Sequence, residues 1–247
     1  MNTKILLSLS VIAAVVAIAI GGTVAYFSDV ETSTGNTFTA GTLDLAIDVD
    51  GVWYGDEPEE TVPAFFNQSD IKPGTSGEKT ISFHVTNDAW LCAYTKKTTD
   101  DDVSCTEPEA AAGDTTCGAG EDGELDEYLD IVIWFDEGSE EGWQCGSTPK
   151  CEEDPTEGDN ILQERQYNYG GEWVLWSGKA KDLPPLLRRP DGKPFNPKKN
   201  EVSYMGIKWS VDKGVGNIIQ SDKLVVDAIL YAEQQKNNPD FTCPATP

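Results

Sequence analysis

The side chains that could do chemistry in this chain are six cysteines, one histidine and a large excess of carboxylates. A zinc peptidase of the HExxH type needs two histidines one helical turn apart on the same face. The single histidine, His84, lies in TISFHVT at residues 80–86, on the polar side of an alternating pattern. GxSxG elbows and phosphate-binding glycine loops are also absent from the sequence. We therefore predict that the protein is not an enzyme.

The cysteines indicate disulfides. Their number is even, which in an exported protein favours a disulfide framework of up to three bonds. Fifteen complete pairings can be drawn for six cysteines, and their spacing does not choose among them. A zinc site made of cysteines alone stays an alternative, although no CxxC pair occurs. The candidates are Cys92, Cys105, Cys117, Cys145, Cys151 and Cys243.

The charge is strongly acidic, with 43 Asp and Glu against 18 Lys and Arg and a net charge of −25. Binding to nucleic acid requires basic surface that neutralises phosphate, so we expect no nucleic-acid partner. The charge fits a soluble exported protein in high salt, or a protein that binds divalent cations. It does not decide between the two.

Calcium is the one candidate cofactor, and we expect no other. Asp48 and Asp50 open an oxygen-rich DVDG loop, and residues 100–102 and 121–127 offer further carboxylates. Trp53 and Tyr54 do not fit the ligand pattern of an EF-hand, so the alternatives are a different calcium site or a solvated acidic surface. Asn67 begins an Asn-Gln-Ser sequon and is a glycosylation candidate.

The elements that must position these groups are strands. Apolar and polar residues alternate over 43–49 and 80–86, which is typical of strands with one wet face. Residues 129–135 are apolar on both faces and predict a central strand. Further strands are predicted over 172–176, 202–211 and 223–232. The alternation changes phase at Met205–Gly206, which predicts a bulge there. Long helical periods are missing, so the sequence predicts an all-β protein, an antiparallel β-sandwich of jelly-roll type.

Two stretches interrupt the strands. An acidic insertion, at about 96–128 and 137–160, holds four of the cysteines, and disulfides would staple a segment too polar to fold alone. Residues 179–199 hold five prolines and seven basic residues, and proline at this density favours an extended surface loop.

The first 25 residues predict a secretory signal helix. Lys4 precedes an apolar run over 5–20, and small residues follow it. Cleavage between Ala25 and Tyr26 would remove residues 1–25, leave a candidate donor strand at 26–41 and a single domain at 42–247, and release a secreted, extracellular or cell-surface protein. We expect a membrane contact only before that cut. The alternative is a retained membrane anchor.

Three separated motifs resemble the TasA/camelysin family, whose leaders are removed by a SipW-type signal peptidase. They are GGTVAYFSDVETSTGNTFTAGTLDL at 21–45, IKPGTSGEKTISFHVTN at 71–87 and GVGNIIQSDKLVVDAILYAEQ at 214–234. The acidic insertion and the proline-rich loop lie outside this resemblance.

The resemblance implies a jelly-roll subunit that polymerises into extracellular fibres or pili of a biofilm matrix. In such fibres the mature N-terminal segment enters the next subunit as a strand, a donor-strand exchange in which the partner is a second copy of the chain. The apolar residues of this segment would be Tyr26, Phe27, Val30 and Phe38. The alternatives are that the segment folds back as an edge strand, that the protein is a secreted or membrane-tethered monomer of camelysin peptidase type, or that it is a cation-binding cell-surface protein.

Overall fold

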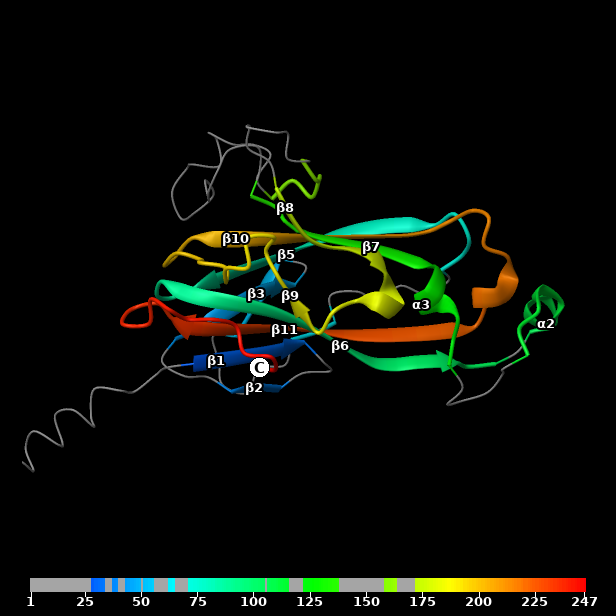
Figure 1. The fold of residues 1–247 in the computed structure, drawn as a ribbon, viewed down its shortest axis with the longest axis horizontal. Coiled ribbons are helices and arrows are strands. Elements are labelled where there is room, and N and C mark those ends of the chain that lie inside the picture. The colour runs from blue at the N-terminus through cyan, green and yellow to red at the C-terminus, as the bar shows by residue number, and fades with distance from the viewer. Residues whose placement is uncertain are drawn as a thin grey trace, which may run out of the picture.

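The structure is a computed structural model that describes residues 28–33, 37–39, 43–49, 51–55, 62–64, 71–104, 106–115, 122–137, 158–163 and 172–247. Its strands form two antiparallel sheets packed face to face (Figure 1). The expected antiparallel sandwich is therefore confirmed. No helix among the described residues is long and apolar enough to cross a membrane. The leader and its cleavage point at Ala25 and Tyr26 lie outside those residues.

The first sheet has the strand order β2-β1-β11-β6-β9. Its strands are β1 (Ser28–Ser33), β2 (Thr37–Thr39), β6 (Ala89–Asp102), β9 (Leu186–Leu187) and β11 (Asp222–Gln234). β6 and β11 are the two longest strands and pair along their full lengths. Very short strands, β2 and β9, occupy both edges of this sheet, which limits the unpaired backbone that an edge exposes.

The second sheet has the order β4-β3-β5-β10-β7-β8. Its strands are β3 (Leu45–Val49), β4 (Val52–Tyr54), β5 (Ser76–Val85), β7 (Leu129–Phe135), β8 (Trp173–Lys179) and β10 (Val202–Val211). The short helices are α2 (Glu107–Ala112) and α3 (Leu125–Tyr128), with 3-10 turns η2 (Ala180–Asp182) and η3 (Asn217–Ile219). β7 lies between β10 and β8, as its apolar sequence predicts.

The main core lies between the two sheets. Ile81, Phe83 and Val85 of β5 are buried in it, on the face that the alternating pattern predicts. Leu230 and Ala232 of β11 meet them from the other sheet. Burying an aliphatic or aromatic side chain of this size contributes about 1.5–3 kcal/mol, so this shared core holds the sheets together.

The predicted bulge at Met205–Gly206 is wrong. β10 pairs continuously through this point with β5 on one side and with β7 on the other. Met205 faces the core, whereas Gly206 faces outward under the buried ring of Trp134, where a Cβ would lie 2.2 Å from ring atoms. The apparent phase change arises because buried Ser203 takes a core-facing position. Glycine is needed at 206 for ring packing.

The proline-rich segment 179–199 is anchored along the edge of the first sheet. It contributes β9, which pairs with β6, and Phe195 forms a further bridge with Leu91. Leu186, Leu187 and Phe195 are buried, so this loop covers the β6 edge and contributes to the core. Residues 96–102, which the sequence assigns to the start of the acidic insertion, continue β6, and α2 follows them.

Candidate functional site

In the first sheet, the N-terminal strand β1 lies next to β11, on the opposite side of β11 from β6. β1 pairs antiparallel with residues 228–233 of β11, so that Ser28 is opposite Glu233 and Ser33 is opposite Ala228. β2 then pairs with β1 on its outer side. The candidate donor segment is thus folded back on its own chain, which is the alternative that the sequence left open. Val30 is opposite Tyr231, and Phe38 of β2 is opposite Glu31.

The stretch of β11 beneath β1 belongs to the core. Ala228, Leu230 and Ala232 pack in the cluster between the sheets, whereas Ile229 and Tyr231 belong to a layer on the outer face. If β1 left this position, the N–H and C=O groups along 228–233 that bond to β1 would lose their partners, whereas the alternate residues would stay paired with β6. Such an edge recruits another strand. The β1 position is therefore one that some strand must fill.

The C-terminal tail, residues 235–247, covers the outer face of β6 and β11. Cys92 of β6 is joined to Cys243 by a disulfide with a Cα–Cα distance of 5.7 Å. The ring of Tyr231 stacks on Phe241, with 6.3 Å between ring centroids. The other four cysteines lie outside the described residues, so their pairing stays a prediction.

Side-chain hydrogen bonds to backbone carbonyls also hold this tail. Trp90 Nε1 donates to the carbonyl of Asn238 at 2.6 Å, and the Tyr94 hydroxyl donates to the carbonyl of Pro244 at 2.9 Å. Burial raises the pKa of Tyr94 to about 12, with Tyr231 adding to the shift. The hydroxyl therefore keeps its proton and its donor role throughout the physiological range.

His84 lies in β5 between β3 and β10. Its ring packs edge-on against Trp53 of β4, with 4.5 Å between centroids. Asp48, predicted as a calcium ligand, accepts a hydrogen bond from the amide of Gly51 at 2.9 Å, as in a tight turn. Asp50 and the glycosylation candidate Asn67 lie outside the described residues, as do Tyr26 and Phe27.

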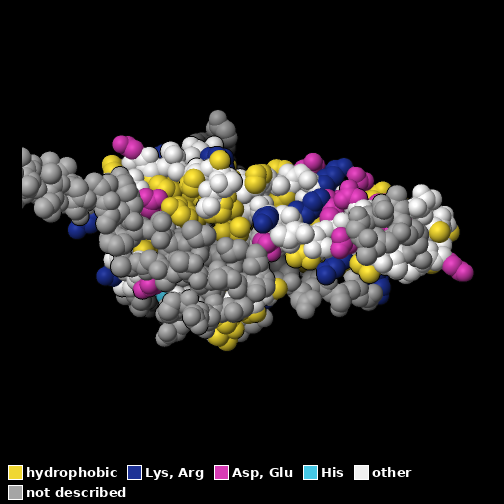
Figure 2. All heavy atoms as spheres, turned by 90° about the horizontal axis from the view of Figure 1, so that it is seen from below, with side chains coloured by type: hydrophobic (Ala, Val, Ile, Leu, Met, Phe, Trp, Pro, Cys, Tyr) yellow, Lys and Arg dark blue, Asp and Glu magenta, His cyan; other side chains and the backbone are white. Residues whose placement is uncertain are grey.

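A cluster of five carboxylates lies at the end of the sandwich that carries α2 and α3 (Figure 1). Two of its members, Asp102 and Glu124, come from the ranges in which the sequence suggested cation ligands. The other three were missed, because they are scattered along the chain and only the fold assembles them. The full set is Asp102, Glu109, Asp114, Glu124 and Asp222. Figure 2 shows acidic and basic side chains gathered toward the same end of the molecule.

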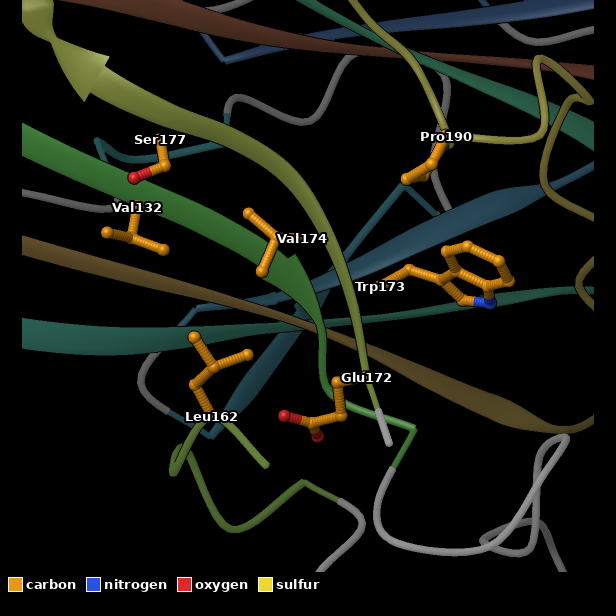
Figure 3. A pocket seen from close by; sticks show the side chains of 7 residues that line it. All are labelled: Val132, Leu162, Glu172, Trp173, Val174, Ser177 and Pro190. Atoms are coloured by element: carbon orange, nitrogen blue, oxygen red, sulfur yellow. The ribbon is translucent and has the colours of Figure 1, made fainter. Parts of the chain in front are cut away.

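A shallow pocket of about 440 Å³ lies on the outer face of the second sheet. Figure 3 shows Val132, Val174 and Leu162 side by side in it, with the Glu172 carboxylate beside Leu162 and Trp173 toward Pro190. Glu172 is buried, and its Oε2 accepts a hydrogen bond from the amide of Gln163 at 2.7 Å. This carboxylate therefore fixes the 158–163 loop.

A buried carboxyl, Asp136, holds the other end of that loop. It accepts hydrogen bonds from the amides of Gly158, at 2.9 Å, and Asn160, at 2.8 Å. Burial raises its pKa, and the bonds to Glu172 and to the two amides oppose that shift. These partners give Asp136 a structural role in shaping the pocket.

The described residues define a disulfide-linked β-sandwich whose N-terminal strand fills a gap beside its last strand. Residues 2–114 match the family model of the camelysin metallo-endopeptidases. Over this part, a little under half of its length, the chain is similar to the camelysin family, which includes TasA-like proteins. The resemblance found in the sequence is thereby confirmed. No curated protein matches the chain.

Proposed function

We propose that the protein is a secreted structural subunit that polymerises head to tail, by donor-strand exchange, into extracellular fibres or pili. The observation that carries this proposal is the pairing of β1 with residues 228–233 of β11. The segment that fills this position lies at the start of the domain. The same segment from a second copy of the chain could pair with β11 in the same way. Exchange between copies would be a heterologous contact that does not close, and such contacts build filaments.

The remaining parts of the proposal follow from this assembly. A SipW-type peptidase would cut between Ala25 and Tyr26, and the cut would free the donor strand from the membrane. The disulfide between Cys92 and Cys243 supports an extracytoplasmic location. A jelly-roll topology is supported by the pairing of the first strand with the last, since such closure is a feature of Greek-key folds.

A covalent lock between β1 and β11 tests the exchange. Thr32 and Ile229 are register partners, so Thr32→Cys with Ile229→Cys should form a disulfide that keeps β1 in its own subunit. We expect this variant to stay monomeric by sedimentation and electron microscopy under oxidising conditions, and to form filaments after mild reduction. The matched control is Val132→Cys with Lys208→Cys, which cross-links β7 to β10 within one sheet. The control should polymerise like the unaltered protein before and after reduction.

Filaments formed by the locked variant under oxidising conditions would refute donor-strand exchange. An unaltered, processed protein that never forms filaments would refute the structural role altogether. Because the reductant also acts on the bond between Cys92 and Cys243, the control variant must be reduced in parallel.

A second candidate function is proteolysis, and the observation that favours it is the description of the matched family. The chain carries a single histidine, so the HExxH arrangement of two histidines cannot form. We propose that the subunit is non-catalytic. Casein hydrolysis by purified protein that is lost in His84→Ala would overturn this part of the proposal, whereas activity unchanged by that substitution would indicate a contaminant.

A further inference from the structure

Two of the five clustered carboxylates face each other across a strand pair. Asp102 is the last residue of β6 and Asp222 is the first residue of β11, and the two are register partners. Like charges directly opposite each other destabilise a sheet. The repulsion between these two carboxylates therefore needs a compensating positive group. The neighbouring elements place further carboxylates there, from Glu109, Asp114 and Glu124.

Helix α2 brings Glu109 to the same place. The Glu109 side chain is fully buried and accepts a hydrogen bond from the amide of Thr106 at 2.6 Å, which starts the helix. Ser221 Oγ lies 2.8 and 3.0 Å from the two carboxylate oxygens of Glu109 and also contacts the carbonyl oxygen of Ser104, so its one proton is shared among these acceptors. Ser221 has a φ of 110°, a conformation that costs free energy in a residue with a Cβ and persists only where the surroundings impose it. Glu109 is thus held in a fixed position next to Asp222.

The remaining two carboxylates come from the flanks of the helices. Asp114 follows Gly113, which caps α2 in the left-handed region, and Asp114 is 3% exposed. Glu124 lies at the start of α3, where the amide of Leu125 donates to Asp222 Oδ2 at 2.7 Å. Gly123 lets this turn approach β6, since a Cβ there would lie 3.0 Å from the carbonyl oxygen of Asp101. Four separate segments of the chain therefore converge on one point.

The spacing of the oxygens suits a calcium ion. The carboxylate oxygens of Asp102, Asp114 and Glu124 lie within 4.8 Å of one another, and so do those of Asp102, Glu109 and Asp222. Calcium binds oxygens at about 2.3–2.6 Å, so two ligands on opposite sides of the ion are separated by nearly 5 Å. Calcium accepts six to eight oxygen ligands in flexible geometry, which suits carboxylates from several elements, whereas magnesium demands near-ideal octahedral geometry and keeps several waters, and zinc favours nitrogen and sulfur ligands.

Asp102 is the shared member of both triads, and its surroundings point to a ligand. The residue is fully buried, and neither of its carboxylate oxygens has a hydrogen-bond partner among the described residues. Burial raises the pKa of this carboxyl, and the neighbouring Asp114 and Glu109 raise it further. The amide of Ser104 opposes this shift. Leaving a buried carboxylate uncompensated costs several kcal/mol, which a bound cation or a proton would remove.

We propose that Asp102, Glu109, Asp114, Glu124 and Asp222 form a calcium site that ties α2 and α3 to the paired ends of β6 and β11. Asp102 is the central ligand. The site is separate from the β1 position, because the nearest β11 residue that pairs with β1, Ala228, is six residues from Asp222, about 20 Å along the strand. Its function is to hold the described residues of the first part of the acidic insertion, about 96–128, against the sandwich.

Calorimetric titration with calcium chloride and thermal unfolding of the purified, chelator-dialysed protein test the site. Both are done in about 1 M potassium chloride, which screens exposed charges to about 3 Å. Calcium at roughly 100 times its dissociation constant should raise the melting temperature by about 5–10 °C. Magnesium at the same concentration should have a much smaller effect.

Asp102→Asn keeps the side-chain shape and removes the central charge. We expect this variant to fold, to melt at or above the temperature of the calcium-free protein, and to bind calcium at least tenfold more weakly. Asp222→Asn should behave in the same way, and it replaces Asp102→Asn as the test variant if Asp102→Asn does not fold. The matched control is Asp101→Asn, one residue away on β6 and outside both triads, which should keep the full calcium response.

Three results would overturn the site. The first is no calcium response in the unaltered protein, in which case a proton shared between Asp102 and Asp114 is the compensating group. The second is a calcium response that survives in both Asp102→Asn and Asp222→Asn, which would place the ion elsewhere on this acidic chain. The third is an equal response to magnesium. Filament formation is measured separately, so loss of the calcium site leaves the proposed function standing.

Discussion

Removing the disulfide between Cys92 and Cys243 should weaken the fold substantially. The bond joins β6 to the C-terminal tail across a sequence separation of 151 residues. A cross-link stabilises chiefly by restricting the unfolded chain, and the restriction grows with the length of the loop that it closes. For a loop of this length the chain-entropy relation gives about 5 kcal/mol.

The tail itself reduces this figure. In Cys92→Ala with Cys243→Ala, residues 235–247 would be held mainly by the bonds from Trp90 and Tyr94 and by the packing of Phe241. A partly released tail regains conformational entropy in the native state, which offsets some of the loss. We therefore expect unfolding free energy to fall by about 3–5 kcal/mol.

Guanidinium unfolding followed by tryptophan fluorescence measures the change. With a slope of about 4–6 kcal/mol per molar for a domain of this size, the midpoint should fall by roughly 0.5–1 M. A chain ending at Gln234 lacks both the tail and the cross-link, and it separates the two contributions: it should be less stable than the double alanine variant. A double alanine variant that unfolds within about 0.5 kcal/mol of the unaltered protein would refute the loop-entropy reasoning.

Two further substitutions test the packing and electrostatics of the sandwich. Gly206→Ala should destabilise the protein by about 1–3 kcal/mol, because its Cβ would overlap the buried Trp134 ring, whereas Gly216→Ala, in open space, should be neutral in the same denaturant titration. Equal effects of the two glycine substitutions would contradict this account. Burial raises the pKa of Asp227 above its ordinary 3.8, with Lys96 opposing the shift, so the folded state binds this proton more tightly than the unfolded state does. That contribution favours folding at low pH and is lost as pH rises through the folded pKa, so Asp227→Asn should melt higher than the unaltered protein at pH 7 and about equally near pH 3. A variant that melts lower at pH 7 would show that the attraction of Lys96 outweighs the cost of burial.

Strands with a clear pattern could be predicted closely from the sequence. Residues 129–135 and 202–211 form β7 and β10 with the expected bounds, because a run that is apolar or alternating has one stable way to face the core. β6 escaped prediction. Its first half is buried, from Ala89 to Tyr94, and its second half is charged, so no single period runs through Ala89–Asp102. Pairing with β11 extends this strand through residues that local pattern assigns to a loop.

In the candidate sites, too, local sequence patterns predict single elements, whereas contacts between distant residues could not be predicted. The sequence predicts that Val30 lies in a strand near the N-terminus. It does not predict whether that strand pairs with β11 of its own chain or of a neighbouring copy. Cys92 and Cys243 could not be paired from spacing, since only the packing of the tail on β6 brings them together. Likewise, Glu109 and Asp222 are 113 positions apart in sequence and meet only because α2 folds against the start of β11.

The ladder between β6 and β11 also decides how a filament would bear load. In the proposed assembly, tension enters each subunit through its N-terminal segment and leaves through the neighbouring strand seated on β11. The force then runs parallel to the 13 residue pairs that join β11 to β6, so their hydrogen bonds must shear together and cannot unzip singly. One end of this ladder is fastened by the disulfide at Cys92, and the other ends at Asp102 and Asp222. A subunit built in this way would resist stretching along the fibre far better than peeling across it.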